Sequence, residues 1–144
     1  MKAAKLLAAG LILFGTVALA AEATDPTVKA RQELMDSFGM NAKILGEMAG
    51  GKTPYDAAAA EAAKAALVAG SAEIAAKFEP QATDPKSTAK PEIWTNWEKF
   101  LANANKLNAA ATALDVSSVE TIGAGMAGVG GACKDCHTEF RVAN

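Results

Sequence analysis

Side chains that bind metals through nitrogen or sulfur are scarce in this sequence of 144 residues, which contains one histidine and two cysteines. A structural zinc site needs four protein ligands, and these three residues cannot complete one. Aromatic residues are also few, at 6%, although 51% of the residues are hydrophobic, so most apolar side chains are small. Basic residues are not clustered along the sequence. The composition therefore argues against a structural zinc site and against a nucleic acid partner.

Long apolar runs are missing after the first twenty residues. Those twenty contain a basic start with Lys2 and Lys5, an apolar stretch at residues 6–19 and a small-residue cleavage signal ending at Ala20, the pattern of a secretory signal peptide, residues 1–20. The stretch is short for a membrane span, which needs about 20 apolar residues, although an uncleaved anchor is an alternative. We therefore expect export to the periplasm and a mature domain, residues 21–144, that stays out of the membrane.

The mature domain is predicted to be all-α, because no stretch alternates in the way that strands do. Four segments instead repeat apolar residues at intervals of three and four, which marks one face of a helix. They lie at about residues 26–49, 53–78, 92–114 and 117–140. Two short turns and one longer, proline-containing loop join them. This pattern predicts an antiparallel four-helix bundle, and its many small side chains leave room for a flat, apolar ligand in the core.

The ends of these helices carry capping signals. Asp25–Pro26 and Thr53–Pro54 each place a capping residue before a proline at the first helical position. Ser117 and Glu120 have the spacing of a capping box for the last helix. We therefore expect the first, second and fourth helices to begin at or next to these residues.

The apolar stripe of the last helix includes both cysteines. It consists of Val119, Ile122, Met126, Val129, Cys133, Cys136 and Phe140. His137, the single histidine, directly follows Cys136 and can point into the same groove. The spacing Cys-x-x-Cys-His is that of a c-type haem attachment site. A disulfide or a thioredoxin-like redox pair is an alternative, but the first gives His137 no role and the second belongs next to a strand. We predict one covalent haem c on Cys133 and Cys136, with His137 as the proximal iron ligand.

A second motif in the same helix lacks the structural context that it needs. Residues 123–128 match G-x-G-x-x-G, but no strand precedes them and no βαβ unit can follow. Five glycines between Gly123 and Gly131 each disfavour the helix by about 1 kcal/mol relative to alanine. We expect close approach of the haem or of a neighbouring helix to explain them.

A single histidine leaves the other face of the iron to a methionine, a water, a gas or nothing. Met35 lies on the stripe of the first helix, whereas Met40 and Met48 fall off it, and Met126 sits on the helix of His137. The stripe consists of Val28, Arg31, Met35, Phe38, Ala42, Leu45 and Ala49, with Arg31 expected at the end of the bundle. Met35 is the candidate distal ligand, and packing in the core is the alternative role.

The sequence resembles the class II c-type cytochromes over the whole mature chain. The resemblance rests on "RQELM", "KTPYD", "KPEIW" and "CKDCHTEFR". It implies a four-helix bundle with the haem near the C-terminus. In the low-spin branch, cytochrome c-556, a methionine of the first helix binds the iron at the position of Met35. In the cytochromes c′ the iron is high-spin and five-coordinate, and its distal face takes nitric oxide or carbon monoxide.

The resemblance also implies a pocket role for Arg141, which is similar to the arginine beside the proximal imidazole in this class; a surface charge is the alternative. Arg31, Phe38 and Phe140 are further candidate pocket residues. No acid-base pair or nucleophile accompanies His137, so we expect no enzymatic activity. We predict a c-556-like periplasmic electron carrier, monomeric or homodimeric, that exchanges electrons with redox partner proteins of unknown identity. Gas binding of the c′ type is the alternative.

Overall fold

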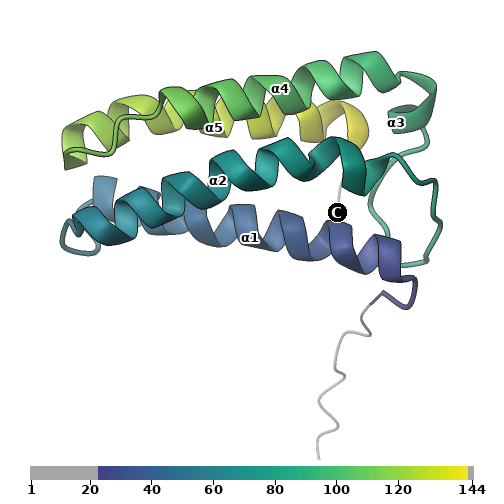
Figure 1. Cartoon of the computed structure of the whole chain (residues 1–144), viewed down its shortest axis with the longest axis horizontal. Helices are drawn as coiled ribbons and strands as arrows, with labels where there is room; N and C mark the ends of the chain where they lie inside the picture. The colour runs from purple at the N-terminus through teal and green to yellow at the C-terminus, as the bar shows by residue number, and fades with distance from the viewer. Residues whose placement is uncertain (1–22, 143–144) are drawn as a thin grey trace, which may run out of the picture.

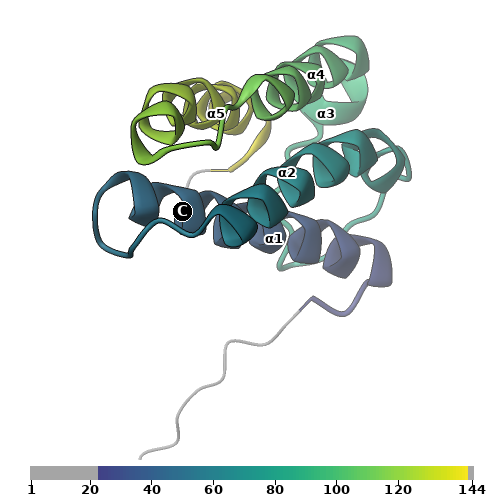
Figure 2. The same ribbon diagram turned by 60° about the vertical axis from the view of Figure 1, so that its left-hand side comes forward.

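The computed structural model describes residues 23–142, so the predicted signal peptide lies outside the described residues. The helices are α1 (Pro26–Ala49), α2 (Ala57–Phe78), α3 (Glu92–Thr95), α4 (Trp97–Ala113) and α5 (Val119–Phe140). Figure 1 shows α1 and α2 as one layer and α4 and α5 as a second layer, with the short α3 at the entrance to α4. The turned view in Figure 2 shows the same two layers. The predicted all-α four-helix bundle is confirmed.

The first helix begins where its capping signal predicts. The Asp25 carboxylate accepts hydrogen bonds from the backbone N–H groups of Thr27 at 2.8 Å and Val28 at 3.1 Å. The second helix does not begin at Thr53–Pro54. It begins at Ala57, because Asp56 adopts an extended conformation and its carboxylate caps the N–H group of Ala59 at 2.9 Å.

The other two predicted helices differ from the structure in their capping and continuity. The capping box of α5 is Ser118 with Thr121, not Ser117 with Glu120, because the Ser118 and Thr121 side chains each bond to the other residue's backbone N–H group. The predicted third helix is interrupted at Asn96, whose backbone leaves the helical region (φ −124°, ψ 45°) and separates α3 from α4.

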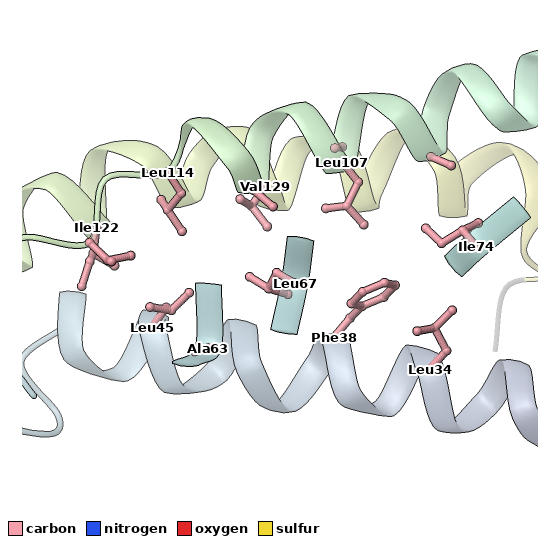
Figure 3. Packing of buried hydrophobic residues seen from close by; sticks show 14 of the residues in the cluster. Leu34, Phe38, Leu45, Ala63, Leu67, Ile74, Leu107, Leu114, Ile122 and Val129 are labelled. Atoms are coloured by element: carbon pink, nitrogen blue, oxygen red, sulfur yellow. The ribbon is translucent and has the colours of Figure 1, made fainter. Parts of the chain in front are cut away.

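Large apolar side chains fill the bundle unevenly. Leu45, Leu114 and Ile122 are almost completely buried and converge at the end of the bundle where α1 runs into α2 (Figure 3). Towards the other end, Phe38 and Leu107 border a cavity that is described below. The packed end therefore stabilises the bundle and leaves the other end hollow.

The loop at residues 79–91 ties the start of α1 and the end of α5 to the hollow end of the bundle. The Asp84 carboxylate accepts bonds from the Thr24 N–H group at 2.8 Å, the Thr24 hydroxyl at 3.0 Å and the Asp25 N–H group at 3.0 Å. Further along the loop, the Lys90 N–H group donates to the Phe140 carbonyl at 2.9 Å, and the Val142 N–H group donates to the Thr88 carbonyl at 2.8 Å. The loop thus fixes the start of α1 and the last turn of α5 relative to each other.

The glycines of α5 only partly match the expectation of close approach. A Cβ atom on Gly125 would collide with the Leu114 side chain, as the expectation requires. A Cβ atom on Gly130 or Gly131 would meet no atom within 4 Å. Close packing of the chain therefore explains Gly125 and does not explain Gly130 or Gly131.

The hydrogen bonds to Asp84 predict a pH-dependent contribution to stability. Bonds from the backbone N–H groups of Asp25, Lys86 and Thr24 lower the pKa of Asp84 to about 2, below the ordinary value of about 3.9. The carboxylate therefore stabilises the fold above about pH 4, and this contribution is lost as the pH falls towards 2. We expect Asp84→Asn to lower the urea midpoint at neutral pH, and the difference from wild type to vanish at the acid end. Glu61→Gln, an exposed change on α2, is the control, and an equal loss in it would contradict this role.

The close contact between α1 and α2 predicts opposite effects of two glycine replacements. A Cβ atom on Gly70 would lie 2.6 Å from Cε1 of Phe38, whereas one on Gly46 would meet nothing within 4 Å. Overpacking costs about 1–3 kcal/mol, and alanine gains about 1 kcal/mol of helix propensity over glycine. We expect Gly70→Ala to lower the free energy of unfolding and Gly46→Ala to raise it by up to about 1 kcal/mol. Stabilisation by both replacements would show that Phe38 has room to move.

Candidate functional site

A cavity of about 660 Å³ opens between the helices at the hollow end of the bundle. Side chains of α1, α2, α4 and α5 line it, together with Ile93 of α3 and residues 87–89 of the long loop. All eight candidate site residues from the sequence border this cavity: Arg31, Met35, Phe38, Cys133, Cys136, His137, Phe140 and Arg141. Its volume is within the range of cavities that hold a bulky ligand.

Helix α5 contributes the two cysteines and the histidine. Cys133 and Cys136 are half-buried free thiols three residues apart on the helix, so they share the face that borders the cavity. Burial raises the pKa of both thiols, that of Cys136 to about 11, where the nearby Cys133 and Glu139 add to the effect. The thiols are therefore protonated at neutral pH, and neither is used in a disulfide.

His137 lies at the mouth of the cavity, with part of its side chain open to solvent. Burial of the rest of the ring and the positive charge of Arg141 lower the pKa of His137. A lowered pKa favours the neutral imidazole, which is the form that binds a metal. Arg141 is exposed, and its backbone N–H group donates to the His137 carbonyl at 3.1 Å. It therefore borders the cavity and is at the same time a surface charge.

Met35 is the methionine that α1 presents to the cavity. It is partly buried and packs against the core. Met40 is 60% exposed, and Met126 packs outside the cavity lining. Met48 lies off the predicted stripe and yet is only 5% exposed, because it packs into the filled end of the bundle. Among the methionines of residues 23–142, Met35 alone borders the cavity.

Arg31 is a buried cation with one unused hydrogen-bond donor. It is 3% exposed, and its guanidinium lies over the rings of Phe78 and Trp94, at 5.0 and 5.3 Å from their centroids. Nε donates to the Lys77 carbonyl at 2.9 Å and Nη2 to the Pro80 carbonyl, while Nη1 is buried without a partner among the described residues. Burial lowers the pKa of Arg31. An unpaired buried donor at a cavity wall indicates an anionic group of a ligand.

Sequence reasoning missed several residues of the cavity wall. Asn103 of α4 is buried, borders the cavity and donates from Nδ2 to the Lys99 carbonyl at 3.2 Å. Asn103 is three residues after Phe100 and four before Leu107, and this spacing could have placed it on the same inward face of the helix. The rings of Phe78 and Phe140 pack against Phe100 at 5.2 and 5.4 Å and close the end of the cavity.

The family model of cytochrome c′ matches residues 26–141. The chain belongs to the class II c-type cytochromes. It is 34% identical to cytochrome c′ of Cereibacter sphaeroides over 149 residues, covering 95% of this chain and 96% of the relative. It is 31% identical to cytochrome c-556 of Agrobacterium fabrum over 135 residues, covering 91% of each chain. The solved structure of oxidised R. palustris cytochrome c-556 superposes with a TM-score of 0.75 at 30% identity, covering 83% of this chain and 98% of that chain.

Family membership confirms two predictions. The cofactor is covalent haem c, and the class consists of haem proteins without enzymatic activity. The cavity fits this group: its wall is largely apolar, Cys133 and Cys136 border it, and Arg31 offers an unpaired donor to a carboxylate such as those of haem. Among the described residues, no group of three His, Cys, Asp or Glu side chains could hold a bare metal ion. No described helix is long and apolar enough to cross a membrane.

Proposed function

We propose that this chain, as the mature domain of residues 21–144, is a periplasmic electron carrier of the low-spin, c-556-like type. In this proposal Cys133 and Cys136 would hold the haem, with His137 as the proximal and Met35 as the distal iron ligand. The observation that carries the proposal is that Met35, from α1, borders the same cavity as the Cys-x-x-Cys-His segment of α5.

The chain would supply binding, orientation and a defined environment for the haem. When bound, haem supplies a one-electron couple between Fe(III) and Fe(II), and a thioether opposite histidine raises its potential. The covalent link keeps the group on the protein through repeated exchanges. The loop at residues 79–91 holds the last turn of α5 through Thr88 and Lys90, which fixes the position of His137. Arg31 would neutralise a carboxylate of the haem inside the cavity.

The two branches of the class differ at the distal face of the iron. The curated relatives carry both names, cytochrome c-556 and cytochrome c′, so the branch depends on whether Met35 binds iron. Support for the low-spin branch comes from the partial burial of Met35 on the cavity wall and from the positions of Met40, Met48 and Met126 outside it. If Met35 did not bind the iron, the distal face of the iron would be open to small molecules such as carbon monoxide.

The export and attachment steps predict one intact mass. We expect the purified protein to have the mass of residues 21–144 plus one haem, measured under denaturing conditions, because thioether bonds survive unfolding. When Cys133 and Cys136 are both replaced by serine, the measured mass should be that of the polypeptide without haem. Loss of the haem when the wild type is denatured would contradict covalent attachment. A mass that includes residues 1–20 would contradict cleavage of the signal peptide.

The distal ligand is tested by replacing Met35. A six-coordinate, low-spin haem gives the reduced protein a sharp α band, and we expect Met35→Ala to abolish this band while the helical circular dichroism is kept. Since Met35 is only partly buried, the stability cost should be near the lower end of the range of about 2–5 kcal/mol for such truncations. Met126→Ala, a partly buried methionine outside the cavity, is the matched control and should keep the band.

The same two variants separate electron transfer from gas binding. The reduced wild type should bind carbon monoxide slowly or not at all, and reduced Met35→Ala should bind it rapidly. If the wild type has a broad high-spin spectrum and binds carbon monoxide rapidly, Met35 only packs and the c′-type function is correct. Failure of the wild type to cycle reversibly in a redox titration would overturn the electron-carrier function itself.

A further inference from the structure

A second hollow lies on the outer side of helices α4 and α5. It is a shallow groove of about 470 Å³, bordered by Lys99 and Lys106 of α4 and by Lys134, Asp135 and Glu139 of α5. Asn103 borders both this groove and the large cavity. The groove and the cavity are therefore separated at that point by a single side chain.

The groove is also directly behind the attachment segment. Successive residues of an α-helix are rotated by about 100°, so Lys134 and Thr138 lie on the side of α5 that is turned away from Cys133 and Cys136. Lys134 and Asp135 are the two residues between the cysteines. A molecule seated in the groove would thus be one helix thickness, about 10–12 Å, from the cavity side of α5.

The charge of the groove is opposite in sign to that of the mature domain. The Lys99 ammonium pairs with the Glu139 carboxylate at 2.6 Å. The ammonium groups of Lys106 and Lys134 have no ion pair or hydrogen-bond partner within residues 23–142, which leaves two unpaired cations against Asp135. Lys90 adds a third cation near the end of α5, where its ammonium donates to the Glu139 carbonyl at 3.1 Å. The mature domain has twelve basic and sixteen acidic residues, a formal charge of −4.

We propose that this groove, bordered by Lys99, Lys106 and Lys134, is the docking surface for an acidic electron-transfer protein. The inference rests on the proposed electron-carrier function and adds the chemistry of its partner. A local excess of positive charge on a negative domain orients an acidic partner towards this face during encounter. Docking there places the partner against the helix to which the haem is covalently linked.

The proposal is tested with two small oxidants of opposite charge, hexacyanoferrate(III) and tris(phenanthroline)cobalt(III). In the first reaction one electron passes from the reduced protein to hexacyanoferrate(III), which becomes hexacyanoferrate(II). At low ionic strength the double variant Lys106→Glu/Lys134→Glu should react about tenfold more slowly with this anion and faster with the cobalt cation. Added salt should reduce both differences, because it screens the charges.

The matched control is Lys43→Glu/Lys52→Glu, which changes the net charge by the same amount on α1 and the turn after it. Both of its lysines are exposed, and we expect its rates to stay within about twofold of wild type. Equal effects in the two double variants would show a response to net charge alone and would overturn the docking surface. Failure of the docking-surface proposal can be distinguished from failure of the electron-carrier proposal by redox titration of each variant. The titration measures reversible cycling of the haem, which does not depend on the charge of the oxidant.

An acidic polypeptide distinguishes a protein-sized partner from a small anion. Poly-L-glutamate should slow the reaction of the wild type with hexacyanoferrate(III) at an ionic strength where phosphate has no effect, and should not slow the groove variant further. Equal inhibition by phosphate and poly-L-glutamate at matched ionic strength would instead identify the groove as a site for small anions and overturn the protein partner.

Discussion

The interior of this bundle must be hollow at one end and still hold four helices together. Leu45, Leu114 and Ile122 meet this constraint by filling the opposite end, where they are almost fully buried. Burying such a side chain contributes about 1.5–3 kcal/mol, and these contacts do not depend on what occupies the cavity. The loop at residues 79–91 adds hydrogen bonds across the mouth of the hollow end. The site is therefore supported from both sides, by packed residues that do not border it and by a loop whose residues 87–89 do.

Arg31 shows what the cavity requires of its ligand. A buried guanidinium is unfavourable unless its donors are satisfied and its charge is compensated. Two backbone carbonyls and two aromatic rings meet part of this need, while Nη1 is left without a partner in the described chain. A ligand with a carboxylate would complete the set. The protein alone is thus electrostatically incomplete at this position, and an anionic group of a ligand would supply the missing charge.

The sequence predicted the number of long helices, the cap at Asp25 and eight candidate site residues that all border the cavity, because apolar spacing and the Cys-x-x-Cys-His segment are local signals. It did not predict the start of α2 at Ala57 or the break at Asn96, since several nearby residues can cap a helix equally well. The lysine-lined groove and the bonds to Asp84 were also missed. Both join residues far apart in the sequence, and no spacing rule connects them.

The position of the site in the chain affects how the protein is made. The cavity needs α1 for Met35 and Arg31, but the attachment cysteines are in α5, which follows all other described helices. A chain translocated from its N-terminus would therefore present four helices, α1 to α4, before any residue that can retain the cofactor. The filled end, which brings Leu45 of α1 against Ile122 at the start of α5, can assemble before Cys136 has crossed. In an exported chain, cofactor loading would consequently come late, on a scaffold whose earlier helices are already present.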